Sequence, residues 1–193
     1  MTGRYRVATA VWVREVVVIA AAAAAVPWIY EHSVDNSARF VLGVAGNNPL
    51  VCVGLNPSTA APGALDPTVT KVSRFAEKNG FDGWVMLNLY PQRSTDPDGL
   101  HLVHEVALAA ENQKRIVHLI NGRKLTIVAA WGNLIESRPY LVPMLADIVP
   151  AADASACQWV SIGPVLKTGH PRHPSRAPYY ALEPFNVKTY LPQ

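Results

Sequence analysis

Four short apolar runs, with helical segments between them, constrain the fold of this chain more than any other feature. They are residues 49–55, 83–90, 125–131 and 159–167. Each run has the length of a strand and few polar residues, as in strands that are buried on both faces of a sheet. We therefore expect an α/β fold, a three-layer sandwich around a central, mostly parallel sheet of four to five strands.

Two of the intervening segments carry clear helix signals. The first begins at Asp66, which can cap a helix, with Pro67 at the first helical position. Gly80 then supplies a left-handed stop. Residues 105–120 form a second predicted helix, which Asn121–Gly122 ends.

The other segments predict a hairpin and a broken helix. Residues 28–44 have the pattern of two strands around a turn at Asp35–Asn36–Ser37. Residues 133–149 have helical character, with expected interruptions at Pro139 and Pro143. The hairpin precedes the first apolar run, and the broken helix lies between the last two.

The composition fits one domain with limited charge. Half of the 193 residues are apolar and 16% are charged, which excludes a disordered or fibrous chain. The formal net charge of +3 permits a polyanionic partner without requiring one, because no run of lysine or arginine occurs. Cys52 and Cys157 lie in apolar surroundings, which favours core residues of a reduced, cytoplasmic protein over a disulfide framework.

The N-terminal part is expected to differ from the rest of the chain. Residues 16–30 are continuously apolar, but this run is shorter than the roughly 20 residues that a membrane span needs. A helix or strand packed on the core is the favoured interpretation, and a targeting segment is the alternative. We therefore divide the chain into an apolar segment of unassigned role, residues 1–29, and a single domain, residues 30–193.

Polar or aromatic groups stand where the apolar runs end. They are Asn56, Asn88, Trp131–Gly132, His170 and His173. In a parallel α/β sheet, ligands bind in the crevice beyond the carboxyl ends of the strands. We therefore expect these groups to meet at one crevice.

Each of the two asparagines has a structural and a functional interpretation. Asn56 precedes a proline, so its side chain either serves its own backbone in a turn or orients a water without deprotonating it. Asn88 lies in an apolar context, where an unpaired amide costs about 1–3 kcal/mol. Its donor and acceptor either pin a neighbouring loop or match the edge of a nucleobase. These residues alone leave both alternatives open.

The segment "GHPRHPS" contains two histidines three positions apart. A proline follows each histidine and no third ligand has a diagnostic spacing, so we predict no metal and no cofactor. Arg172 and Arg176 suit an anion or a phosphate backbone, with one imidazole donating to a developing negative charge. The alternative is a loop shaped by prolines whose histidines are merely exposed.

In chain order, these motifs resemble the uracil-DNA glycosylase superfamily. The segment "GLNP" is similar to the family's motif that places the attacking water, and "VMLNLYPQRSTDP" is similar to the strand end that reads the base. "VAAWG" and "HPS" match a later structural strand and a loop that contacts the base and the minor groove. The fuller pattern "GLNPSTA…DPT…NL…R.TDP…GHPRHP" is closer still to a bacterial and phage family, the domain of unknown function numbered 1643.

This resemblance implies roles for individual residues. Asn56 would hold the water, Asn88 would read the base, and His173, or its rival His170, would stabilise the departing base. Further ligand contacts are expected at Gly54, Pro57, Ser58, Thr59, Arg93, Arg172 and Ser175.

The resemblance also has a departure, because the most active glycosylases carry an aspartate where Asn56 stands. The expected function is a pocket for a nucleobase or nucleotide, with N-glycosylase (hydrolase) activity on a modified base in nucleic acid. The alternatives are a non-catalytic module that binds nucleic acid or a nucleotide, and an enzyme acting on a small nucleotide-like metabolite.

Overall fold

The computed structural model describes residues 12–15, 18–19 and 26–191 of the chain. Its strands are β1 (Trp12–Glu15), β2 (Val18–Ile19), β3 (Val26–Ser33), β4 (Arg39–Val44), β5 (Pro49–Gly54), β6 (Gly83–Asn88), β7 (Thr126–Ala129), β8 (Gln158–Ile162) and β9 (Leu182–Pro184). Its α-helices are α1 (Pro67–Lys78), α2 (Val106–Ile120) and α3 (Leu141–Ala154). Short 3-10 helices cover Pro97–Gly99, Gly132–Ser137, Pro174–Arg176 and Val187–Tyr190. The α/β class is therefore confirmed.

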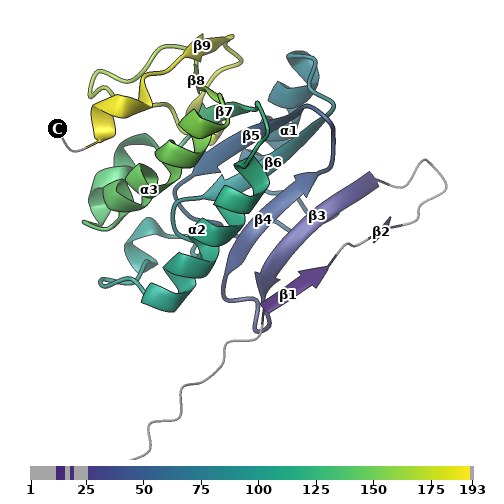
Figure 1. Cartoon of the computed structure of the whole chain (residues 1–193), viewed down its shortest axis with the longest axis vertical. Coiled ribbons are helices and arrows are strands. Elements are labelled where there is room, and N and C mark those ends of the chain that lie inside the picture. The colour runs from purple at the N-terminus through teal and green to yellow at the C-terminus, as the bar shows by residue number, and fades with distance from the viewer. Residues whose placement is uncertain (1–11, 16–17, 20–25, 192–193) are drawn as a thin grey trace, which may run out of the picture.

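All four apolar runs contain strands, and these strands lie side by side in one sheet (Figure 1). Parallel pairing joins β6 to β5, β5 to β7 and β7 to β8. The sheet is larger than expected, however, with the order β1-β3-β4-β6-β5-β7-β8-β9 and with β2 paired to β3. Every pairing outside the four central strands is antiparallel, so the prediction of a mostly parallel sheet of four to five strands is wrong.

The predicted hairpin explains part of this difference. Strands β3 and β4 form it, and the turn between them includes Asn36 at a φ of 58°. Such a tight connection forces antiparallel pairing, and β4 then pairs antiparallel with β6. The residues of β4 are almost all buried, so its pattern cannot be told from that of a parallel strand.

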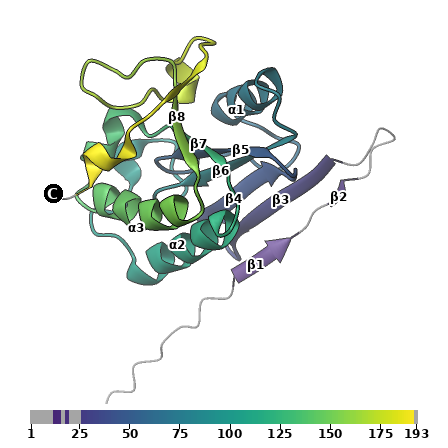
Figure 2. The ribbon, with the colours of Figure 1, turned by 45° about the horizontal axis from the view of Figure 1, so that its top comes forward.

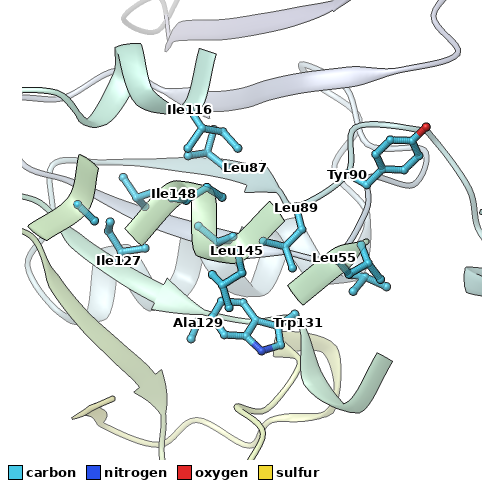
Figure 3. Packing of buried hydrophobic residues seen from close by; sticks show 14 of the residues in the cluster. Leu55, Leu87, Leu89, Tyr90, Ile116, Ile127, Ala129, Trp131, Leu145 and Ile148 are labelled. Atoms are coloured by element: carbon cyan, nitrogen blue, oxygen red, sulfur yellow. The ribbon is translucent and has the colours of Figure 1, made fainter. Parts of the chain in front are cut away.

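Helices cover both faces of the sheet (Figure 2). Helix α1 packs its apolar side on one face, in a cluster with Leu50, Cys52 and Met86. Helices α2 and α3 pack on the other face, in the larger cluster. Figure 3 shows part of that cluster, with Leu145 and Ile148 of α3 near Ile127 and Ala129 of β7.

Local signals set the helix ends largely as the sequence predicts. The Asp66 carboxylate accepts a hydrogen bond from the Val69 N–H at 2.8 Å, and Pro67 opens α1. Pro139 separates a 3-10 helix from α3. The expected interruption at Pro143 does not occur, because Pro143 lies in the first turn of α3, where a proline removes no intrahelical bond.

Little of the expected N-terminal segment can be assessed. Apart from β1, β2 and the beginning of β3, residues 1–29 lie outside the described residues. The boundary drawn after residue 29 falls within β3, which pairs with β4 along its length. Among the described residues, no helix combines the length and apolar character that crossing a bilayer requires.

Candidate functional site

A cavity of about 670 Å³ lies where the four parallel strands end at their carboxyl side. The chain segments that follow all four of these strands contribute to its wall. Its lining includes Arg39, Gly54, Leu55, Asn56, Ser58, Asp66, Pro67, Thr68, Val69, Met86, Asn88, Ser94, Thr95, Trp131, Gly132, Asn133, Leu134, Leu166, Arg172, His173, Ser175 and Arg176. The strand ends therefore meet at one crevice, because parallel strands present their carboxyl ends at the same edge.

Asn88 ends β6 and is 1% exposed. Neither its Oδ1 nor its Nδ2 has a hydrogen-bond partner, and neither atom is open to water. The opposite residue on β5 is Gly54, where an added Cβ would lie 3.0 Å from the Asn88 Oδ1 and 3.2 Å from the Met86 Cε. The absence of a side chain at Gly54 therefore makes room for the Asn88 amide, which lines the cavity without a partner.

Asn56 lies one residue beyond Leu55 in the loop after β5. Its Nδ2 donates to the carbonyl oxygen of Pro57 at 3.1 Å and to that of Ser94 at 2.9 Å. Two carbonyl acceptors on one side of the amide identify that atom as nitrogen. Its Oδ1 consequently faces away from them and accepts no hydrogen bond from the described residues, so it is available to orient a water.

His173 lies in the loop after β8 and caps the short 3-10 helix Pro174–Arg176. Its Nδ1 lies 2.7 Å from the Ser175 Oγ and accepts from the Ser175 N–H at 3.4 Å. Burial, followed by the charge of Arg176, lowers the pKa of His173 below 6.5. This lowering favours the neutral imidazole, and its proton is on Nε2 because Nδ1 accepts.

His170 has a different environment from that of His173. It is buried, with Nδ1 2.7 Å from the Tyr190 hydroxyl and Nε2 3.1 Å from the Glu136 carboxylate. Both ring nitrogens are occupied, and the residue is not part of the cavity wall. The structure thus brings His173, and not His170, to the cavity.

Three further predicted contact residues lie outside the cavity wall, and two of them, Arg93 and Pro57, hold the loops behind it. Arg93 donates to the carbonyl oxygens of Ser58 and Ala60 and, at 2.8 Å, to the Tyr30 hydroxyl. Pro57 is buried, and its carbonyl accepts from the Ser94 N–H at 2.9 Å. Thr59 is exposed and, like Pro57 and Arg93, lies outside the cavity wall. Gly54, Ser58, Arg172 and Ser175 belong to the wall.

Arg39, the first residue of β4, is a cavity residue that the sequence reasoning missed. It is 1% exposed, and its one side-chain hydrogen bond runs from an Nη atom to the Ala60 carbonyl at 3.0 Å. Burial, followed by the charge of Arg93, lowers the pKa of Arg39 to about 10. The sequence did contain a signal for it: an arginine begins a strand that is otherwise apolar, and a charge buried there is costly unless it binds a partner.

The cavity carries more positive than negative charge. Arg39, Arg172 and Arg176 line it, and Asp66 is the one acidic residue in its wall. The Asp66 carboxylate also caps α1, as the sequence predicts. In the described part of the chain, no group of three or more His, Cys, Asp and Glu side chains is arranged to hold a metal ion.

The fold and the site define an α/β protein with a positively charged cavity at the carboxyl edge of its parallel strands. A family model described as "Protein of unknown function (DUF1643)" matches residues 39–175, and the chain belongs to this family. The matched range contains every cavity residue named above except Arg176. Neither a search of curated proteins nor a search of solved structures found a match.

Proposed function

We propose that the cavity binds a nucleobase and hydrolyses the bond between that base and its sugar, in a uracil-DNA-glycosylase-like arrangement. The observation that carries this proposal is the buried, unpaired amide of Asn88. A carboxamide offers one donor group and one acceptor, the pair that the edge of a nucleobase complements. A cavity of about 670 Å³ has room for a base with its sugar.

Binding requires a small change at Asn88. Both polar atoms of its side chain are covered in the ligand-free protein, so the amide has to turn toward the cavity that it lines. A base that pairs with both atoms removes the cost of leaving them unpaired. The same pairing discriminates against bases with the wrong edge, because these leave a buried polar group without a partner.

The reaction would depend on stabilising the charge of the departing nucleobase more than on a general base that deprotonates the water. The glycosidic C–N bond breaks with its electron pair moving to the nucleobase, a water oxygen bonds to the sugar carbon, and the proton that this water loses passes through solvent to the released base. Asn56 would orient that water through its free Oδ1 but cannot accept its proton. The Nε2–H of His173 would donate to the departing anionic base. Asp66 is the one carboxylate in the cavity wall, and it caps α1, so we assign it no role as a general base. Without a general base, we expect the reaction to be dissociative and slow.

Release of free base from a panel of modified single-stranded and double-stranded oligonucleotides and from nucleotides tests the proposal. We expect release with at least one substrate, a large loss with Asn56→Ala and no binding with Asn88→Ala. Asn121→Ala, an exposed residue after α2, is the control and should behave as the wild type. Binding that depends on Asn88 without release from any substrate would identify a binding module instead of a hydrolase. Release that is unchanged in Asn56→Ala would refute the assignment of the water.

A further inference from the structure

A second group in the cavity lacks a partner, and it is a charge. Arg39 is 1% exposed, its Nε has no hydrogen bond, and one Nη atom donates to the Ala60 carbonyl. Within the described residues it forms no ion pair with any carboxylate. Burying a guanidinium away from water without a counterion costs on the order of several kcal/mol of free energy, as for other buried charges. An arginine of this kind therefore indicates an anion that binds beside it.

The neighbours of Arg39 add to this positive charge. Arg93 donates to the same Ala60 carbonyl at 3.4 Å, so two guanidinium groups flank one backbone oxygen. Arg93 also makes no ion pair among the described residues. Asp66, the acidic residue of the cavity wall, caps α1 and forms no ion pair with Arg39 among the described residues. Its charge raises the pKa of Arg39, but by less than either burial or the charge of Arg93 lowers it. This one carboxylate therefore does not balance the guanidinium groups around it.

Other cavity residues are suited to an anion. Thr68 and Val69 bring the first turn of the twelve-residue helix α1 to the wall, where backbone N–H groups and the helix dipole favour negative charge. Arg172 and Arg176 also line the wall, in the loop that carries His173. The Arg172 Nε is occupied by the Pro164 carbonyl at 3.0 Å, whereas its Nη atoms have no partner among the described residues.

We propose that the cavity contains an anion subsite built on Arg39, and that its ligand is a nucleotide with a terminal phosphate. Guanidinium and phosphate match in shape and charge and form paired hydrogen bonds. The nucleobase part of this inference rests on the proposed function, whereas the anion subsite does not. Such a subsite favours a mononucleotide over a free base, a nucleoside or a continuous strand.

The depth of Arg39 argues for a terminal phosphate. A polynucleotide backbone stays near the surface, where half-buried and exposed arginines such as Arg172 and Arg176 neutralise its phosphates. Arg39 is instead closed to water, at the start of an interior strand of the sheet. A small phosphate that enters the cavity can reach such a group, but the backbone of a continuous strand cannot follow it.

Calorimetry and thermal shift on the full chain test the subsite. The probes are inorganic phosphate, a panel of common nucleoside 5′-monophosphates with the matched nucleosides, and a short single-stranded oligonucleotide without terminal phosphates. We expect at least one monophosphate to bind about 10- to 100-fold more tightly than its nucleoside, as a charge-assisted hydrogen bond to a buried group implies. Arg39→Met should remove this difference, and Arg39→Lys should keep part of it.

The control is Arg138→Met, because Arg138 is a half-buried arginine that donates to the Leu100 carbonyl and does not line the cavity. It should leave phosphate binding unchanged. Equal binding of monophosphate by wild type and a folded Arg39→Met would overturn the inference, as would an oligonucleotide that binds as tightly as the monophosphate. If Arg39→Met does not fold, an unchanged phosphate preference in Arg39→Lys overturns it. Base release measured on the same samples separates the two proposals: phosphate binding without release refutes hydrolysis alone, and release without phosphate preference refutes the subsite alone.

Discussion

Replacing Asn88 by leucine should make the ligand-free protein more stable. The side chains have the same number and branching of heavy atoms, and Asn88→Leu removes a buried amide whose two polar atoms have no partner. Burying such an amide costs about 1–3 kcal/mol in proteins, so the free energy of unfolding should rise by about that amount. For a chain of 193 residues this corresponds to a rise in Tm of roughly 3 to 9 °C.

The matched control is another buried asparagine. Asn112 on α2 is 2% exposed, and its Nδ2 donates to the carbonyl oxygens of Asn88 and Leu89 at 2.9 and 3.0 Å. The Asn112 Oδ1 is buried without a partner, but Asn112→Leu also removes two hydrogen bonds, so on balance it should lower the free energy of unfolding by about 1 kcal/mol. The two substitutions are chemically identical and lie side by side, yet their expected effects have opposite signs.

Urea unfolding followed by circular dichroism measures both variants, with the slope of the transition checked for constancy. The wild type should bind the nucleobase ligand and Asn88→Leu should not. A fall in the free energy of unfolding for Asn88→Leu would show that the Asn88 amide has partners in the ligand-free protein. That result would remove the reason for treating it as a binding group.

Three further changes follow from the cavity geometry. Gly54→Ala should displace the Asn88 amide and weaken ligand binding at a stability cost of about 1 kcal/mol, because the new Cβ would lie 3.0 Å from the Asn88 Oδ1. Asn56→Asp should lower the free energy of unfolding by about 1–3 kcal/mol, because a carboxylate oxygen would face two carbonyls that now accept from Nδ2. His173 has a lowered pKa in the folded state, so the unfolded chain binds its proton first and stability should fall as the pH drops below 6.5. Unfolding measured from pH 7.5 to 5 should show this fall, and His173→Gln should reduce it.

Each of these changes has a comparison within the chain. Gly43→Ala should destabilise far more than Gly54→Ala, because its Cβ would lie 2.4 Å from the Trp84 carbonyl oxygen. Asn133→Asp should be nearly neutral, since only the acceptor Oδ1 of that exposed amide is engaged, by the Thr168 hydroxyl. His118→Gln, the same substitution on the exposed side of α2, should leave the free energy of unfolding at pH 7.5 unchanged. Similar losses for Asn56→Asp and Asn133→Asp, or a pH profile unaltered by His173→Gln, would contradict the assigned contacts.

Local patterns predicted much of the fold and part of the site. The four apolar runs contain the parallel strands, Asp66 caps the first helix, and the turn at Asp35–Ser37 joins a hairpin. These features depend on neighbouring residues and on strand periodicity, which are readable along the chain. The strand ends also meet as expected, because the direction of a parallel strand places its polar terminus at a known edge.

The direction of the outer strands and the partners of individual polar groups depend on contacts between residues far apart in the chain. Strand β4 is buried like the parallel strands β5 and β6, and its antiparallel pairing with β6 follows from assembly of the sheet. His170 and His173 are equivalent in the sequence, but Tyr190 and Glu136 occupy the first while the second lines the cavity. Arg39 gave only a weak signal, because its unpaired charge becomes evident once the strands around it have closed it from water. A hydrogen bond or its absence is a property of the packed chain, so residue type and spacing indicate which groups are polar but not which of them lack a partner.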